Sequence, residues 1–234
     1  MNENQPMNLG LSRAEASERG FLSQVYFWMA MALALSGFSA WWMAMSPNLV
    51  IALMRNVGLF WLLAIAQIGI VFWLSSQVTR LSLMSATIGF SVYATLNGVL
   101  LSWILLVYTA ASVASTFFIT AGTFAIVSTY GFMTKRNLAS LGNLCFMGLI
   151  GIILASLVNW FFKSPAVDCV ISYLGVAIFV GLTAYDTQRL KSIHEAGFES
   201  QDALKKVAIL GALALYLDFI NLFLMLLRVL GRRK

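Results

Sequence analysis

Two aspartates interrupt the apolar segments near the end of the chain, and their carboxylates are the groups best placed to do chemistry. Asp186 lies in Ala-Tyr-Asp-Thr-Gln at 184–188, and Asp218 in Leu-Tyr-Leu-Asp-Phe-Ile-Asn-Leu-Phe at 215–223. An aspartate in mid-bilayer costs at least ~2.5 kcal/mol and persists only beside a partner or water. Counted from Val207 at about 1.5 Å per residue, Asp218 lies roughly 16 Å into its segment, near the bilayer centre. An ionisable residue at that depth indicates a functional site.

The two aspartates stand in consecutive apolar segments, so side-by-side packing would bring their carboxylates together. Two carboxylates ~4 Å apart repel by about 4 kcal/mol at an effective dielectric of 20. The pair would then share a proton up to about pH 7 and titrate as a unit, which predicts a pH sensor and gate without a histidine. Protonated, the pair would latch two helices. Deprotonated, it would repel or recruit a cation, for which the candidates are Arg80, Arg189 and Ca²⁺.

Each aspartate also has a purely structural interpretation. A protonated Asp218 could hydrogen-bond a neighbouring helix, and Asp186 could pair with Arg189 on the next turn and do little. A carboxylate near a helix C-terminus faces the unfavourable end of the helix dipole, which favours a specific partner for Asp186. Asn221 follows Asp218 by three positions, shares its helix face and is expected to help orient it. Two further polar side chains are expected to support the pair: Tyr185 and Thr187.

The ligands around the aspartates suit a weak, transient Ca²⁺ site. Calcium takes six to eight oxygen ligands, and two carboxylates with Asn221, Thr187 and backbone carbonyls would supply a loose set. That suits a leak, and a pump is not expected because no Gly-x-x-x-x-Gly-Lys phosphate loop is present. No cofactor is expected. The two cysteines, Cys145 and Cys169, are expected to be small buried hydrophobic residues. Together with the one histidine, His194, they do not make a transition-metal site.

The amino-acid composition indicates that these residues lie in a membrane protein. Of the 234 residues, 60% are apolar and 10% are charged, whereas a soluble domain is about half apolar and about a quarter charged. The chain is therefore predicted to be an integral membrane protein whose main partner is the lipid bilayer. The formal charge is +6, but the basic residues stand singly or in pairs between apolar runs. That placement is typical of orientation signals, so no nucleic-acid binding is expected.

Seven apolar segments are long enough to cross a membrane as helices, which takes about 20 residues each. They cover 21–45, 57–76, 82–108, 111–133, 141–162, 167–188 and 207–229. The sequence predicts an all-α polytopic bundle in which 21–230 form one membrane domain, 1–20 a cytoplasmic polar arm and 231–234 a basic tail. The connection at 189–206 is expected to be the one long loop, charged and mobile, and to contain His194.

The basic residues predict a cytoplasmic N-terminus. In that orientation, nine Lys and Arg residues lie in the arm and the cytoplasmic loops, against Arg55 and Lys163 on the other side. No cleavable signal peptide is evident. The basic tail fits this pattern poorly, so the last segment is either re-entrant or crosses fully and carries the tail across.

The two aspartate motifs and the seven apolar segments resemble the Bax inhibitor-1 (transmembrane Bax-inhibitor-motif) family, most of all the bacterial Bax inhibitor-1/YccA-like members. The resemblance covers essentially the whole chain. It implies a seven-helix bundle with the last helix central, and a pH-sensitive calcium leak in which Asp186 and Asp218 act as the sensor. It also implies a bacterial cytoplasmic (inner) membrane, and some bacterial relatives are linked to a membrane-bound AAA protease. The family has a basic residue directly after its second helix, where this chain has Ser75 and Ser76, with Arg80 the nearest cation.

Two alternatives to a passive cation leak come from different classes. An intramembrane aspartyl protease would use one carboxylate to activate water and the other to protonate the leaving group. Tyr185-Asp186 resembles half of the presenilin pattern, but the Gly-x-Gly-Asp half is absent, so no enzyme is expected. The other alternative is a non-catalytic membrane partner that modulates a membrane protease or a stress response through 1–20 and 189–206.

Overall fold

The computed structural model describes residues 5–77, 80–198 and 200–234, with side chains from residue 17 onward, and within these ranges its regular structure is helical throughout. Within the described ranges eight helices follow one another: α1 (Gln5–Ala44), α2 (Pro47–Arg55), α3 (Val57–Ser76), α4 (Leu83–Val107), α5 (Ala110–Met133), α6 (Ala139–Phe162), α7 (Pro165–Glu195) and α8 (Gln201–Leu230). Seven of them are long and apolar enough to cross a membrane, and α2 is the exception. The predicted all-α, seven-span membrane architecture is confirmed.

Two boundaries differ from the expectation. The predicted long loop at 189–206 is wrong, because α7 continues to Glu195 and α8 begins at Gln201. His194 therefore lies in the last turn of a helix, where its ring stacks on Phe21 of α1 with centroids 5.0 Å apart. Charged residues favour helix as readily as apolar ones do, so the change in polarity marks the end of the apolar span but not the end of the helix.

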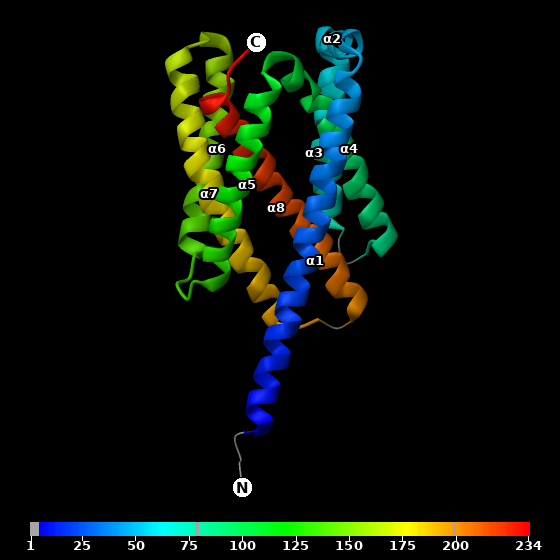
Figure 1. Ribbon diagram of the computed structural model, residues 1–234, viewed down its shortest axis with the longest axis vertical. Helices are drawn as coiled ribbons and strands as arrows, with labels where there is room; N and C mark the ends of the chain where they lie inside the picture. Colours follow the sequence, from blue (N-terminus) through cyan, green and yellow to red (C-terminus); the bar gives the residue numbers. More distant parts are fainter. Residues whose placement is uncertain (1–4, 78–79, 199) are drawn as a thin grey trace.

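The predicted polar arm at 1–20 is helical from Gln5 onward. The helix begins at Gln5 and runs without a break into its apolar part, and in Figure 1 its first turns extend beyond the rest of the bundle. The short helix α2 has no counterpart among the predicted elements. It begins with Pro47 at its first position, where proline's missing N–H costs nothing.

The last helix is the centre of the bundle, as the resemblance implied. In its most apolar 18-residue stretch 67% of the residues are buried, against 6% in α3. It packs against α1, α4, α5 and α7, and Leu215, Tyr216 and Leu222 are fully buried. Figure 1 shows α8 crossing the bundle between its neighbours from one end to the other.

The α8 helix is one continuous segment, which decides between a re-entrant and a fully crossing last segment. The first turns of α1 and the end of α8 lie at opposite ends of the bundle (Figure 1), so the basic tail lies away from the start of α1. The tail pairs with the α4–α5 turn: the Lys234 amide donates to the Val107 carbonyl at 2.9 Å, and the Arg232 amide donates to Ser112 Oγ at 2.8 Å.

Candidate functional site

The α7 and α8 helices bring the two aspartates together. The carboxyl groups of Asp186 and Asp218 lie within hydrogen-bonding reach of one another. Asp218 is 5% exposed, and its Oδ2 atom is buried without a hydrogen-bond partner among the described residues. Asp186 is partly buried. A buried carboxylate oxygen without a donor is costly, whereas one shared proton between the two groups would satisfy it.

Close helix contacts on both sides of the pair set its register. Leu190 of α7 packs on Gly211 of α8, and Met225 of α8 packs on Gly175 of α7. Glycine has no side chain to hold the backbones apart, so these two positions let the helices approach closely. The aspartates lie between them, on facing sides of the two helices. The pairing is thus a consequence of how the antiparallel helices meet.

The residues beside Asp186 face other helices. The Tyr185 ring covers Gly142 of α6, while the Thr187 hydroxyl donates to its own helix at Thr183 (2.8 Å) and reaches Ser128 Oγ of α5 at 3.3 Å. Successive helical residues point about 100° apart, so Asp186 faces α8 while its two neighbours face α6 and α5. Tyr185 and Thr187 hold α7 in place and make no hydrogen bond to the aspartate pair within the described ranges.

Asn221 is oriented differently from the expectation. Its Nδ2 donates to the Leu217 carbonyl of its own helix at 2.8 Å, and the side chain lines a cavity with Trp61, Trp160 and residues of α6. No hydrogen bond joins it to Asp218 in the part of the chain that the structure describes. A shared helix face therefore does not lead to a side-chain contact here.

The two candidate counter-ions occupy different positions. Arg189 is exposed, and its charge acts on Asp186, although no ion pair within 4 Å joins them. Arg80 is exposed in the link between α3 and α4. Across the described residues the one ion pair joins Lys191 to Glu18, so the expectation that Arg80 pairs with an aspartate is not met in this conformation. Helix α3, which precedes Arg80, packs mainly on α4.

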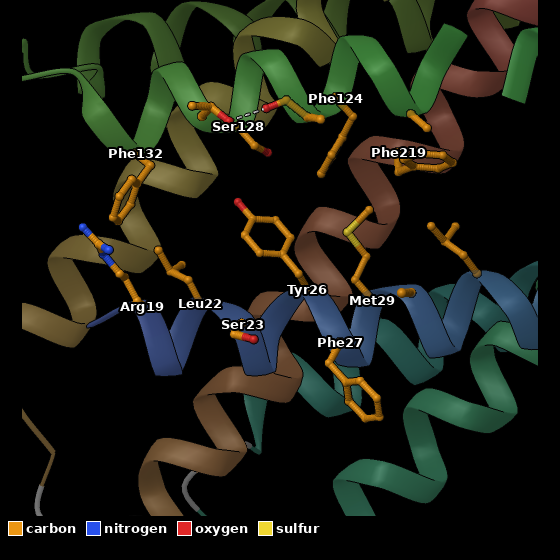
Figure 2. A pocket seen from close by; sticks show the side chains of 15 residues that line it. Arg19, Leu22, Ser23, Tyr26, Phe27, Met29, Phe124, Ser128, Phe132 and Phe219 are labelled. Carbon is orange, nitrogen blue, oxygen red and sulfur yellow. Dashed lines mark hydrogen bonds between the residues drawn. The ribbon is translucent and has the colours of Figure 1, made fainter. Parts of the chain in front are cut away.

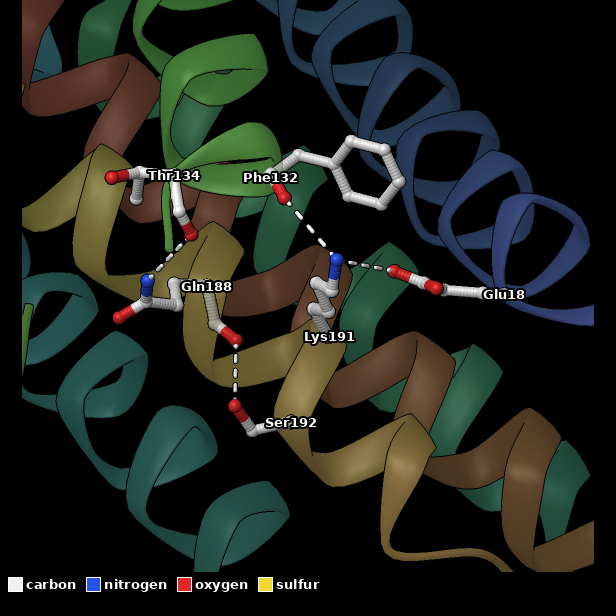
Figure 3. A network of polar contacts seen from close by, with 6 residues as sticks. All are labelled: Glu18, Phe132, Thr134, Gln188, Lys191 and Ser192. Carbon is white, nitrogen blue, oxygen red and sulfur yellow. Dashed lines mark hydrogen bonds and ion pairs between the residues drawn. The ribbon is translucent and has the colours of Figure 1, made fainter. Parts of the chain in front are cut away.

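Lys191 of α7, which the sequence did not single out, ties three helices together (Figure 3). Its Nζ lies 3.3 Å from Glu18 Oε1 of α1 and 3.4 Å from the Phe132 carbonyl of α5. One turn earlier, Gln188 donates to the Arg136 carbonyl at 2.8 Å. These partners are more than 50 positions away in sequence, and no local pattern signals them.

The cysteines separate into two environments. Cys145 of α6 is buried, as expected, but it packs against Gly181 of α7 and lies within range of the Asp218 charge. Cys169 is exposed, which corrects the expectation that both are buried. It follows the first turn of α7, near the start of that span. No three His, Cys, Asp or Glu side chains come together as a metal site within the described residues.

Comparisons with known proteins give a consistent picture. A family model described as "Inhibitor of apoptosis-promoting Bax1" matches residues 18–234. The chain is 48% identical over 231 residues to the inner membrane protein YbhL of Escherichia coli K12, which covers 98% of both chains. It is 42% identical over 217 residues to an uncharacterized protein of Rickettsia prowazekii, covering 92% of this chain and 91% of the relative. An uncharacterized membrane protein of Streptococcus pyogenes is 36% identical over 214 residues, covering 91% and 92%.

Proposed function

Because the chain belongs to the Bax inhibitor-1 family of integral membrane proteins, we propose that it is a passive, proton-regulated cation leak with Ca²⁺ as the permeant ion. Asp186 and Asp218 form the gate. The observation that carries the proposal is the approach of a buried Asp218 carboxyl, otherwise unpartnered among the described residues, to the carboxyl of Asp186. No catalytic step is part of the proposal, and modulation of a membrane protease stays a prediction.

The gate works through one shared proton. With that proton, the two carboxyl groups hydrogen-bond and hold α7 against α8. Without it, two charges ~4 Å apart repel by about 4 kcal/mol at an effective dielectric of 20, which is enough to shift a two-state equilibrium by about a thousandfold. The hydrogen bond between the two carboxyls is therefore present at low pH, and it is lost as the pH rises through the midpoint at which the pair loses its shared proton. Once both carboxylates are ionised, their oxygens are free to receive a cation that enters between the helices.

Flux into liposomes tests this gate. Purified protein is reconstituted around a calcium dye, and Ca²⁺ entry is followed from pH 5 to 9. The wild type is expected to change its flux with a midpoint inside this range, because the coupled pair gains or loses its shared proton as one unit. In Asp218→Asn the amide is a permanent donor to Asp186, and in Asp186→Asn it is a permanent donor to Asp218, so both variants are expected to lose the midpoint.

Asp202→Asn is the matched control, because Asp202 is an exposed acid in the first turn of α8. It is expected to keep the wild-type profile. Absence of Ca²⁺ flux at every pH would overturn the leak itself. The same pH profile in the wild type and both paired variants would overturn the gate while leaving the leak intact.

A further inference from the structure

A long groove runs between α1 and α5 on the side of the bundle, and nothing in the mechanism above uses it (Figure 2). Its volume is about 820 Å³, within the size range of small-molecule sites. Leu22, Phe27 and Leu33 line one wall, and Ala121, Ala125 and Phe132 line the other. Both helices are candidate membrane spans, so this groove opens where lipid surrounds the protein.

The groove has one charged end. Arg19 lines it at the point where the α1 span begins, and Ser23 follows one turn further in. The other end is apolar as far as Leu33. Between Arg19 and Leu33 the helix rises by about 21 Å at 1.5 Å per residue. One leaflet of the hydrocarbon core is about half of 30 Å thick, so the groove is long enough for a headgroup and one acyl chain.

We propose that this groove binds one phospholipid with an anionic headgroup, with an acyl chain between α1 and α5 and the phosphate against Arg19. The guanidinium offers paired N–H donors that match phosphate oxygens. The apolar walls exclude the headgroup and accept the chain, which fixes the orientation of the lipid. The hydroxyls of Ser23, Tyr26, Ser128 and Thr129 lie in the half of the groove near Arg19, and the half that ends at Leu33 offers a polar peptide or nucleotide no partners.

The lipid site adjoins the aspartate pair without being part of it. Phe219, at the base of the groove, follows Asp218 in the chain. Ser128 in the α5 wall accepts the hydrogen bond from Thr187, which follows Asp186. The proposal concerns binding alone and does not depend on ion flux, so its failure would leave the gate untouched.

Native mass spectrometry of the purified full chain tests the site. The protein is equilibrated with phosphatidylglycerol or with phosphatidylcholine of identical acyl chains, and the fraction that retains one lipid is measured. The wild type is expected to retain phosphatidylglycerol about tenfold more tightly, the equivalent of one charge-assisted hydrogen bond. Arg19→Gln is expected to remove that preference. Ala125→Phe is expected to lower retention of both lipids, because it fills the groove.

Two matched controls separate the site from general surface effects. Arg136 is an exposed arginine outside the groove, and Ala34 is an exposed alanine of α1 that does not line it. Arg136→Gln and Ala34→Phe are expected to behave as the wild type does. Equal retention of the two lipids by the wild type, or the same loss in the control variants, would overturn the proposal. Size-exclusion chromatography of each variant verifies that it remains folded.

Discussion

A shift of one position along a helix changes which neighbouring helix a polar side chain near the aspartate pair can contact. Asp186 faces α8, whereas Tyr185 and Thr187 face the helices on either side. Asn221 shares a sequence motif with Asp218 but satisfies its amide on its own helix. The two motifs contain the carboxyls that come together, but most of their other polar members do not touch the pair, because neighbouring side chains leave the helix about 100° apart.

The Glu18–Lys191 ion pair gives a prediction at the residue scale. We expect a double-mutant cycle of Glu18→Gln and Lys191→Met to give a coupling energy of 0.2–1 kcal/mol, about the value typical of pairs with solvent access. The side chains are 15% and 30% exposed, so the coupling is expected to weaken in high salt. Methionine keeps an apolar side chain of similar length but removes the Nζ atom that lies 4.8 Å from the centre of the Phe132 ring. The cycle separates the ion pair from that contact, because Glu18→Gln leaves the contact in place.

The free energy of unfolding in detergent measures this coupling. Lys205→Gln is the control for loss of one positive charge, because Lys205 is exposed on α8. A coupling energy of zero would mean that the ion pair does not hold α1 against α7. A coupling that is unaffected by salt would contradict the partial exposure of the pair.

Glycines lie at the closest contacts between helices. Gly131 of α5 meets the backbone of Ala184 on α7, and Gly98 of α4 meets the carbonyl of Ser36 on α1. The α5–α7 crossing lies two residues before Asp186, so it helps to position α7 for its contact with α8. The same packing leaves other glycines without a neighbour: a Cβ added at Gly122 of α5 would meet nothing within 4 Å.

Two substitutions on the same helix test this difference. Gly131→Ala is expected to destabilise the protein by about 1–3 kcal/mol, because its methyl group would be forced against a backbone that has no room to move aside. Gly122→Ala is expected to be neutral or to stabilise by up to about 1 kcal/mol, because alanine favours helix and the space is open. Thermal unfolding in detergent measures both. Equal effects of the two substitutions would contradict the close α5–α7 crossing.

Among the described residues the bundle has seven candidate membrane spans, an odd number, and the start of α1 and the end of α8 lie at opposite ends of it. The docking of residues 231–234 on the α4–α5 turn holds the basic tail against the bundle. With the excess of Lys and Arg in the N-terminal arm and its side of the bundle, we expect the N-terminus in the cytoplasm and the tail outside. Cys169 lines a cavity beside Arg228 and Arg233, at the tail's end of the molecule.

Cysteine labelling tests this orientation in the membrane. A membrane-impermeant maleimide added to intact spheroplasts is expected to label the wild-type protein at Cys169, which is exposed, and to spare Cys145, which is buried. Cys169→Ser is expected to lose the label, and Cys145→Ser to keep it. Labelling that requires permeabilised membranes would place the N-terminus outside. Labelling retained in Cys169→Ser would contradict the burial of Cys145.

The sequence by itself determined the membrane class, the seven spans and the two aspartates, because each follows from local features. Length and hydropathy set a span, and the cost of a charge in lipid singles out an intramembrane acid. The tertiary structure alone decided that α7 and α8 bring the carboxyls together, that Arg80 does not pair with them, and that Lys191 joins α1 to α7. Those facts depend on helix rotation and register. The rotation and register of each helix are set by side-chain packing between residues far apart in sequence. The apolar sequence of a span does not specify them, because every side of such a helix is compatible with lipid.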